Sequence, residues 1–149
     1  MPPRIQNRVR SFPQAVGVRN EKVLFDSMGT VDSKIGSGSM AVQCVRLEDV
    51  LRDANPTFIK FDIEGAELDA LTGGREVIAR SRPILAVSVY HQHDHLWRVP
   101  LLIREFCPDY RFYLQPYGLD GWDLVCFAVP VERLANHRHY SVFQKRSGI

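Results

Sequence analysis

The sequence predicts an α/β fold whose partly parallel sheet ends in an antiparallel hairpin. Residues 57–74 read as a strand that passes through a tight turn into a helix, which is half of a βαβ unit. Residues 84–89 form a nearly unbroken apolar run after Pro83, as is typical of a parallel strand covered on both faces. Two strand-like runs, 110–114 and 122–129, are joined by a short link rich in turn residues, which requires an antiparallel hairpin.

Shorter elements are expected in the first part of the chain. Residues 5–12 have a weak helical period, while 14–18, 23–25 and 41–45 are rich in β-type residues. The Gly- and Ser-rich residues 32–40 predict a loop. Residues 47–53 predict a short helix that ends before Asn55-Pro56, because the residue before a proline disfavours the helical conformation.

The most informative stretch is the strand expected at residues 58–63 and the helix expected at 66–71, which Gly73 and Gly74 end. Asp62 and Glu64 stand at the carboxyl end of this strand, where open α/β sheets bind their ligands. Carboxylates at such a turn also cap helices and interact favourably with the helix dipole. The spacing alone leaves both interpretations open.

A helix is expected at residues 96–106, since the apolar side chains of Leu96, Val99, Ile103 and Phe106 follow a helical spacing. Pro100 fits this helix if it lies in the first turn. Residues 131–149 are polar and predict a loose tail.

Composition bounds the class of protein. The chain has 149 residues, 45% of them hydrophobic and 24% charged, and a net charge of +2, which gives no strong argument for a nucleic-acid or membrane partner. Its three cysteines include no CxxC pair, and Cys44 and Cys126 lie in apolar runs, so they are interpreted as buried hydrophobic residues. With no apolar run of about 20 residues, we expect a cytoplasmic protein.

Several segments together resemble a known family. Residues 58–67 read Phe-Ile-Lys-Phe-Asp-Ile-Glu-Gly-Ala-Glu, with Leu71 and Gly73 following. Residues 45–51 before them, and Tyr90-His91 and residues 96–100 after them, continue the pattern. Over residues 14–130 the chain resembles the FkbM-type methyltransferase family. The resemblance implies a class I, Rossmann-like sheet, S-adenosylmethionine as cofactor, and O-methylation of a small-molecule hydroxyl on a sugar or natural product.

The same resemblance suggests site residues. Asp62 or His91 would be the catalytic base, and Glu64, Glu67 and Tyr117 would contact substrate, unless the two glutamates cap the helix. For His91 the alternative is a strand-end histidine bonded to a backbone carbonyl. The chain departs from the family at His95, where an aspartate is common, and at Pro116, where a histidine is common.

Two features implied by the class I fold are not found in the sequence. These are the Gly-rich loop after the first strand and the acid that binds the ribose, so no cofactor-binding residues are assigned. We therefore expect residues 1–149 to be one partial methyltransferase domain, with its recognisable core at 14–130 and its tail at 131–149. The alternative is a non-catalytic remnant, or a subunit that needs a partner. One edge of strand 58–63 would then be exposed and promote self-association.

The histidine-rich run His91-Gln92-His93-Asp94-His95 raises a different alternative, a metal-dependent hydrolase that also uses Asp62. In an extended segment the three histidines would face one way and hold a transition metal. The run is one spacer shorter than the metallo-β-lactamase pattern that it resembles, and a helix is expected to begin nearby. We therefore predict that no metal is bound by all three.

Overall fold

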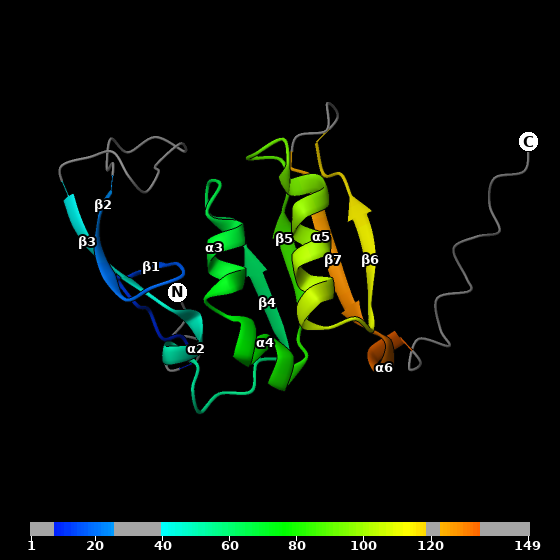
Figure 1. The fold of residues 1–149 in the computed structure, drawn as a ribbon, viewed down its shortest axis with the longest axis horizontal. Coiled ribbons are helices and arrows are strands. Elements are labelled where there is room, and N and C mark those ends of the chain that lie inside the picture. The colour runs from blue at the N-terminus through cyan, green and yellow to red at the C-terminus, as the bar shows by residue number, and fades with distance from the viewer. Residues whose placement is uncertain (1–7, 26–39, 119–122, 135–149) are drawn as a thin grey trace, which may run out of the picture.

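A computed structural model shows two β-sheets with helices between and over them, and it describes residues 8–25, 40–118 and 123–134 (Figure 1). The first sheet has the strand order β1-β3-β2, and the second has the order β4-β5-β7-β6. The chain is therefore an α/β protein, as the sequence predicted, but its strands form two mixed sheets rather than the single sheet that was expected.

The N-terminal sheet contains β1 (Ala15–Val16), β2 (Glu21–Phe25) and β3 (Met40–Val45). β1 runs parallel to β3 and β2 runs antiparallel to it. These strands confirm the three β-type runs of the sequence. The predicted helix at 5–12 is wrong for residues 8–12, which are not helical, and the predicted loop at 32–40 lies outside the described residues except for its last residue. Helix α2 (Leu47–Val50) is shorter than predicted.

The larger sheet contains β4 (Phe58–Phe61), β5 (Ile84–Ser88), β6 (Tyr110–Gln115) and β7 (Val125–Pro130). β4 and β5 are parallel, while β7 is antiparallel to both β5 and β6. The predicted hairpin is therefore present, and its second strand lies inside the sheet between β5 and β6. β4 is an edge strand among the described residues.

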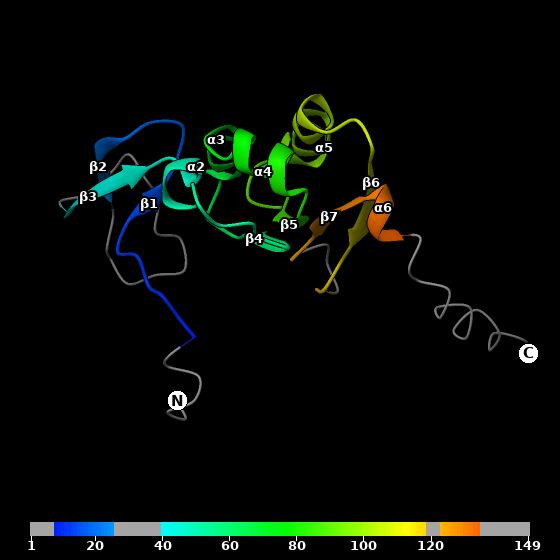
Figure 2. The same cartoon turned by 90° about the horizontal axis from the view of Figure 1, so that it is seen from below.

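Three helices cover one face of the larger sheet: α3 (Glu67–Thr72), α4 (Arg75–Ser81) and α5 (His95–Phe106) (Figure 2). Alternate residues of each strand point toward them. The core between sheet and helices contains Leu71, Ile78, Leu85, Val99 and Ile103, each with 0% exposure. No helix in the described ranges lies on the opposite face (Figure 2).

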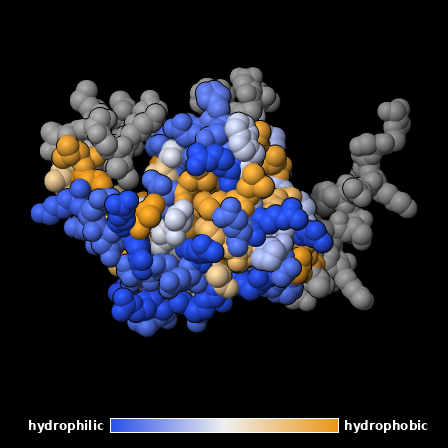
Figure 3. Space-filling model, viewed as in Figure 1, coloured by the Kyte–Doolittle hydropathy of each residue, from blue (hydrophilic) through white to orange (hydrophobic). Residues whose placement is uncertain are grey.

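Helix α5 differs from its prediction in two details. Pro100 lies in the second turn rather than the first, because the helix begins at His95 and a turn takes about 3.6 residues. Trp97 and Leu101 are more than half exposed, and Figure 3 shows hydrophobic patches among polar side chains on this helical face. In the part of the chain that the structure describes, no helix is long and apolar enough to span a membrane.

A close main-chain approach lies between the N-terminal sheet and the end of helix α3. A Cβ atom on Gly73, at the end of α3, would lie 2.0 Å from the carbonyl oxygen of Gly17, just after β1. The Gly73 carbonyl also accepts a hydrogen bond of 3.1 Å from the Glu48 N–H in α2. Glycine at this position therefore lets the N-terminal sheet approach the helical layer.

The segment after β7 corrects one prediction. Residues 131–149 were expected to be a loose tail, yet Val131–Leu134 forms helix α6, and the remainder lies outside the described residues. Glu132 in this helix accepts hydrogen bonds from Arg82 Nε and Nη2 at 2.5 and 2.8 Å. This bidentate pair attaches the start of α6 to the end of α4.

The Arg82–Glu132 pair predicts a pH effect on stability. Hydrogen bonds from Arg82 lower the pKa of Glu132 from 4.5 to about 2. A carboxylate whose pKa is lowered by folding stabilises the folded state at pH values above its ordinary pKa. This contribution is lost as the pH falls from about 4.5 toward 2. Because Glu132 is half exposed, we expect less than about 1 kcal/mol. In urea unfolding, the wild type should be more stable than Glu132→Gln at pH 7, and the two should be equally stable at pH 2.

Candidate active site

The turn between β4 and α3 has an unusual backbone. Glu64 and Gly65 both have positive φ angles, 54° and 99°, which reverse the chain within a few residues. A Cβ atom on Gly65 would lie 2.8 Å from Gln92 Nε2, so the turn packs closely against the segment that follows β5. Residues from the carboxyl ends of the two parallel strands are thereby brought together.

Glu67 is the centre of the resulting cluster. It has 0% exposure, and its Oε1 accepts a hydrogen bond of 3.1 Å from the Ile63 N–H. The same oxygen lies 2.7 Å from His91 Nδ1. The sequence offered substrate contact or helix capping for Glu67, and in the structure this carboxylate is fully buried, with its Oε1 bonded to the Ile63 N–H and to His91.

The two ring nitrogens of His91 differ in their surroundings. Nδ1 is hydrogen-bonded to Glu67, and Nε2 has no hydrogen-bond partner among the described residues. With Glu67 as a carboxylate, Nδ1 carries the proton that it donates to Oε1, which leaves the lone pair on Nε2. Nε2 lies 3.7 Å from Asp62 Oδ1 and 3.6 Å from Glu64 Oε2, and the side chain is only 6% exposed. The structure thus places Asp62, Glu64 and His91 together, and Glu67 replaces the backbone carbonyl considered as a partner of His91.

Asp62 is held in its ionised form. Burial works against the charge, yet hydrogen bonds from Lys60 Nζ at 2.5 Å and Ser88 Oγ at 2.9 Å keep the pKa of Asp62 below its ordinary value. A carboxylate with a lowered pKa is a weak base at neutral pH. Between the two residues proposed as base, the environment of Asp62 therefore favours a role as a fixed negative charge.

His95 is a member of the cluster that the sequence did not assign to the methyltransferase site. It is 3% exposed, and its Nδ1 lies 3.2 Å from Glu67 Oε2, although neither atom makes a hydrogen bond within the described residues. His95 follows His91 by four residues, and a segment that bends between them can bring both imidazole rings to one carboxylate. This spacing is the sequence signal that could have indicated His95. His93, by contrast, is exposed.

The metal-hydrolase alternative lacks a ligand set in this structure. Across residues 8–25, 40–118 and 123–134, no three His, Cys, Asp or Glu side chains are placed to hold a metal ion. His91 and His95 both face Glu67, while His93 is exposed to solvent. The three cysteines are buried and unpaired, in agreement with the interpretation of Cys44 and Cys126.

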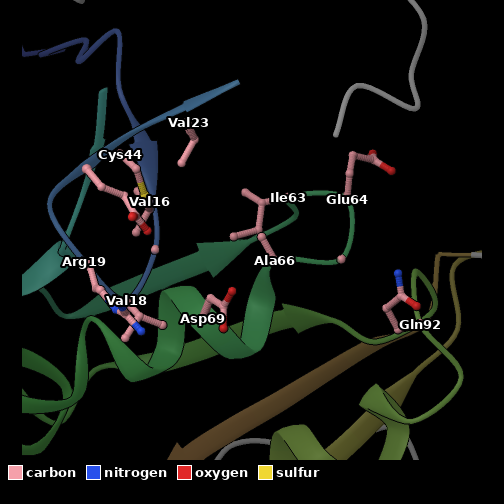
Figure 4. Close-up of a pocket in the computed structure, with 13 residues that line it drawn as sticks. Val16, Val18, Arg19, Val23, Cys44, Ile63, Glu64, Ala66, Asp69 and Gln92 are labelled. Carbon is pink, nitrogen blue, oxygen red and sulfur yellow. The ribbon is translucent and has the colours of Figure 1, made fainter. Parts of the chain in front are cut away.

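A cavity of about 550 Å³ lies between the N-terminal sheet and the β4–α3 turn. Figure 4 shows Val16, Val23 and Cys44 on the side of the N-terminal sheet, with Ile63 and Glu64 on the side of the turn. Asp69 also lines it. The volume suits a nucleoside-sized ligand, the apolar wall suits a purine ring, and the carboxylates suit ribose hydroxyls. These residues therefore suit the nucleoside part of S-adenosylmethionine, whereas no described strand leads into a Gly-rich helix start beside them to hold the methionine part.

A second cavity of about 430 Å³ lies on the uncovered face of the larger sheet. Its floor comes from alternate residues of β4, β5 and β7, and its lining includes Asp62, Tyr90, Tyr117 and Asp123. Burial, with the negative charges of Asp62 and Asp123, raises the pKa of Tyr90 to about 12, so its hydroxyl remains protonated. Tyr117 is 66% exposed at the rim and does not belong to the buried cluster.

Comparison with known proteins gives two findings. The methyltransferase FkbM domain matches residues 5–118 of the chain. The crystal structure of methyltransferase FkbM from Methylobacillus flagellatus KT aligns with a TM-score of 0.67 and 28% sequence identity, over 85% of this chain and 30% of that one. The chain thus spans less than a third of the length of that protein. No curated protein matches the sequence.

Proposed function

The chain belongs to the FkbM methyltransferase family, and from that premise we propose that it serves S-adenosylmethionine-dependent O-methylation of a hydroxyl on a sugar or natural product. His91 is the general base in this proposal. The observation that carries it is the buried Nε2 atom of His91, which has no hydrogen-bond partner among the described residues. It faces Asp62 and Glu64 at the carboxyl end of β4.

The chemistry explains why these residue types are needed. An alcohol is a poor nucleophile, so a base must take its proton while the oxygen–methyl bond forms. S-Adenosylmethionine, when bound, supplies a methyl group activated on a cationic sulfur. His91 Nε2 accepts the hydroxyl proton, the ionised Asp62 stabilises the imidazolium that results, and Glu67 keeps the ring in the required tautomer and orientation. Glu64 and Tyr117 contact the substrate.

The first cavity supplies one wall of the cofactor site in this proposal. Asp69 would accept hydrogen bonds from the ribose, and Val16 and Ile63 would contact the purine. The sequence contains no Gly-rich loop that follows a strand and opens a helix, as is needed to hold the methionine part. We therefore expect weak binding of S-adenosylmethionine by residues 1–149, with a dissociation constant above about 1 mM, or −4 kcal/mol. Titration calorimetry measures this, and micromolar binding would contradict it.

Product analysis tests the reaction itself. The protein is incubated with S-adenosylmethionine labelled with tritium in its methyl group and with a set of glycosides, polyols, sugar acids and amino sugars. Label in a base-stable methyl ether supports O-methylation. Label in a base-labile ester or in a methylamine contradicts it, and the absence of transfer to any of these alcohols would favour a non-catalytic role.

A subunit that requires a partner is the second candidate, favoured by the position of β4 at the edge of its sheet among the described strands. Each strand residue has backbone groups that need hydrogen bonds, and a free edge recruits other strands. We propose that the chain self-associates through Phe58–Phe61, the bounds of β4. Sedimentation equilibrium should then show a dimer or larger species. Phe58→Lys at the edge should weaken it at least tenfold, whereas Leu101→Lys on the exposed side of α5 should not. A stable monomer would contradict this candidate.

A further inference from the structure

We propose that His95 is a positioning residue for the base: its Nδ1 atom donates a hydrogen bond to Glu67 and so fixes the carboxylate that orients His91. The inference rests on the proposed function, in which His91 accepts the hydroxyl proton. His95 stands where an aspartate is common in the family, so the resemblance does not imply this role.

Burial is the first argument. Three polar or charged side chains are buried in the part of the chain that the structure describes, namely Glu67, Ser88 and His95. The Ser88 hydroxyl donates to Asp62, whereas His95 Nδ1 and Glu67 Oε2 face each other at 3.2 Å with no hydrogen-bond partner among the described residues. Two buried lone pairs at this distance repel, and both remain unpaired. A proton on Nδ1, with a small rotation of the ring, turns the two opposed acceptors into a donor and an acceptor.

The carboxylate of Glu67 gives the second argument. Its Oε1 atom accepts a hydrogen bond of 3.1 Å from the Ile63 N–H and lies 2.7 Å from His91 Nδ1, so one oxygen serves both contacts. A carboxylate held by one oxygen still rotates about its last side-chain bond, where the torsional preference is broad. A donor at Oε2 fixes the plane of the group, and with it the direction of the lone pair that accepts the hydrogen bond from His91. His95 is the residue that faces Oε2.

The main chain gives the third argument. His91 lies between β5 and α5, outside both elements, so the orientation of its ring depends on side-chain contacts. These are the contact with Glu67 and a contact with Tyr90, whose ring centroid lies 4.1 Å away. Glu67 begins α3, and His95 begins α5, with its N–H donating to the Gln92 carbonyl oxygen at 3.1 Å. A Glu67–His95 bond therefore fixes the base relative to two helices instead of one.

The primary test locates protons and does not require methyl transfer. A long-range ¹H–¹⁵N correlation spectrum of the ¹⁵N-labelled protein at neutral pH reports which nitrogens of each imidazole carry protons, and single histidine-to-asparagine variants assign the signals. We expect a proton on Nδ1 of both His91 and His95. In His95→Leu, which removes the donor, the fraction of His91 with its proton on Nε2 should rise about threefold or more. His95→Asn keeps a donor at about the reach of Nδ1 and should restore the wild-type state of His91.

Methyl transfer gives the second readout. His95→Leu should lower the maximal single-turnover rate by about 10- to 100-fold, because a small misplacement of a catalytic group is costly. The acceptor concentration at half-maximal rate should stay within about twofold, since His95 lines neither described cavity. His95→Asn should return the rate to within about threefold of the wild type.

Asp94→Ala is the matched control. Asp94 precedes His95 at the start of α5 and accepts a hydrogen bond of 2.7 Å from Arg98, so its loss weakens the same helix start without removing a donor to Glu67. A proton on Nε2 rather than Nδ1 of His95, an unchanged His91 in His95→Leu, or equal rate losses in His95→Leu and Asp94→Ala would each overturn the inference.

Two further outcomes have separate meanings. If His95→Leu does not fold, the protonation of His95 in the wild type and the state of His91 in His95→Asn test the inference by themselves. If the His91 tautomer shifts in His95→Leu but no methyl transfer occurs in any variant, the proposed function is overturned and the coupling of His95 to His91 stands.

Discussion

Replacing His91 with asparagine should lower the rate of methyl transfer by about 10²- to 10⁴-fold, the contribution typical of a general base. The asparagine amide reaches about as far as Nδ1, so it still donates a hydrogen bond to Glu67 Oε1, which Nδ1 approaches at 2.7 Å. It removes Nε2, the atom without a partner among the described residues. The fold should therefore be kept while the base is lost. Single-turnover rates with labelled S-adenosylmethionine measure the effect.

His93→Asn is the control for this substitution. His93 is exposed and lies two residues along the same segment, so its loss removes a neighbouring imidazole without changing the cluster. We expect a rate within a factor of two of the wild type. Comparable losses in the two variants would show that His91 acts through the structure of the segment rather than as a base.

Gly73→Ala should lower the free energy of unfolding by about 2–3 kcal/mol, near the top of the range for overpacked sites. The added Cβ atom would meet the Gly17 carbonyl oxygen at 2.0 Å, and a backbone atom in a paired strand segment cannot rotate away. For a chain of this length each kcal/mol changes Tm by about 2–4 °C. We therefore expect a decrease of roughly 4–12 °C in a thermal melt followed by circular dichroism.

Gly74→Ala provides a graded comparison at the next residue. Its Cβ atom would first meet Leu47 Cδ2 at 3.0 Å, the end of a flexible side chain, and then the Ala70 carbonyl oxygen at 3.2 Å. The loss of stability should be less than half of that in Gly73→Ala. Hydrogen exchange in β1 and β3 should also increase in Gly73→Ala alone. Identical melting temperatures for the two variants would contradict a contact specific to Gly73.

Local patterns predicted most elements of the larger sheet. The run at 58–63 and the apolar run at 84–89 became β4 and β5, because unbroken β-type residues next to turn residues have few alternatives. The position of β7 between β5 and β6 was not predictable in this way. Strand order depends on which edges remain free after helices and loops pack, and no single segment encodes it.

Part of the site could also be predicted from local patterns along the chain. Both residues proposed as base follow neighbouring parallel strands, whose carboxyl ends meet at one edge of a sheet, and Asp62 and His91 do lie close together. The role of Glu67 was not foreseen, since the first turn of a helix is usually solvated. Here the positive φ angles of Glu64 and Gly65 direct the first turn of α3 toward the protein interior. His95 was missed because its partner, Glu67, is separated from it by 28 residues and a complete strand.

The place of β7 in the sheet sets the order in which the chain can fold during synthesis. β7 is the last of the described strands to be synthesised, and it lies between β5 and β6, which are therefore not direct neighbours of each other. Until Pro130 has been added, β6 has no partner in this sheet and β5 has one open edge. A nascent chain that pauses after β6 therefore exposes two edges that recruit other strands. Slow translation between Gln115 and Val125 would extend the period in which the growing chain needs a chaperone.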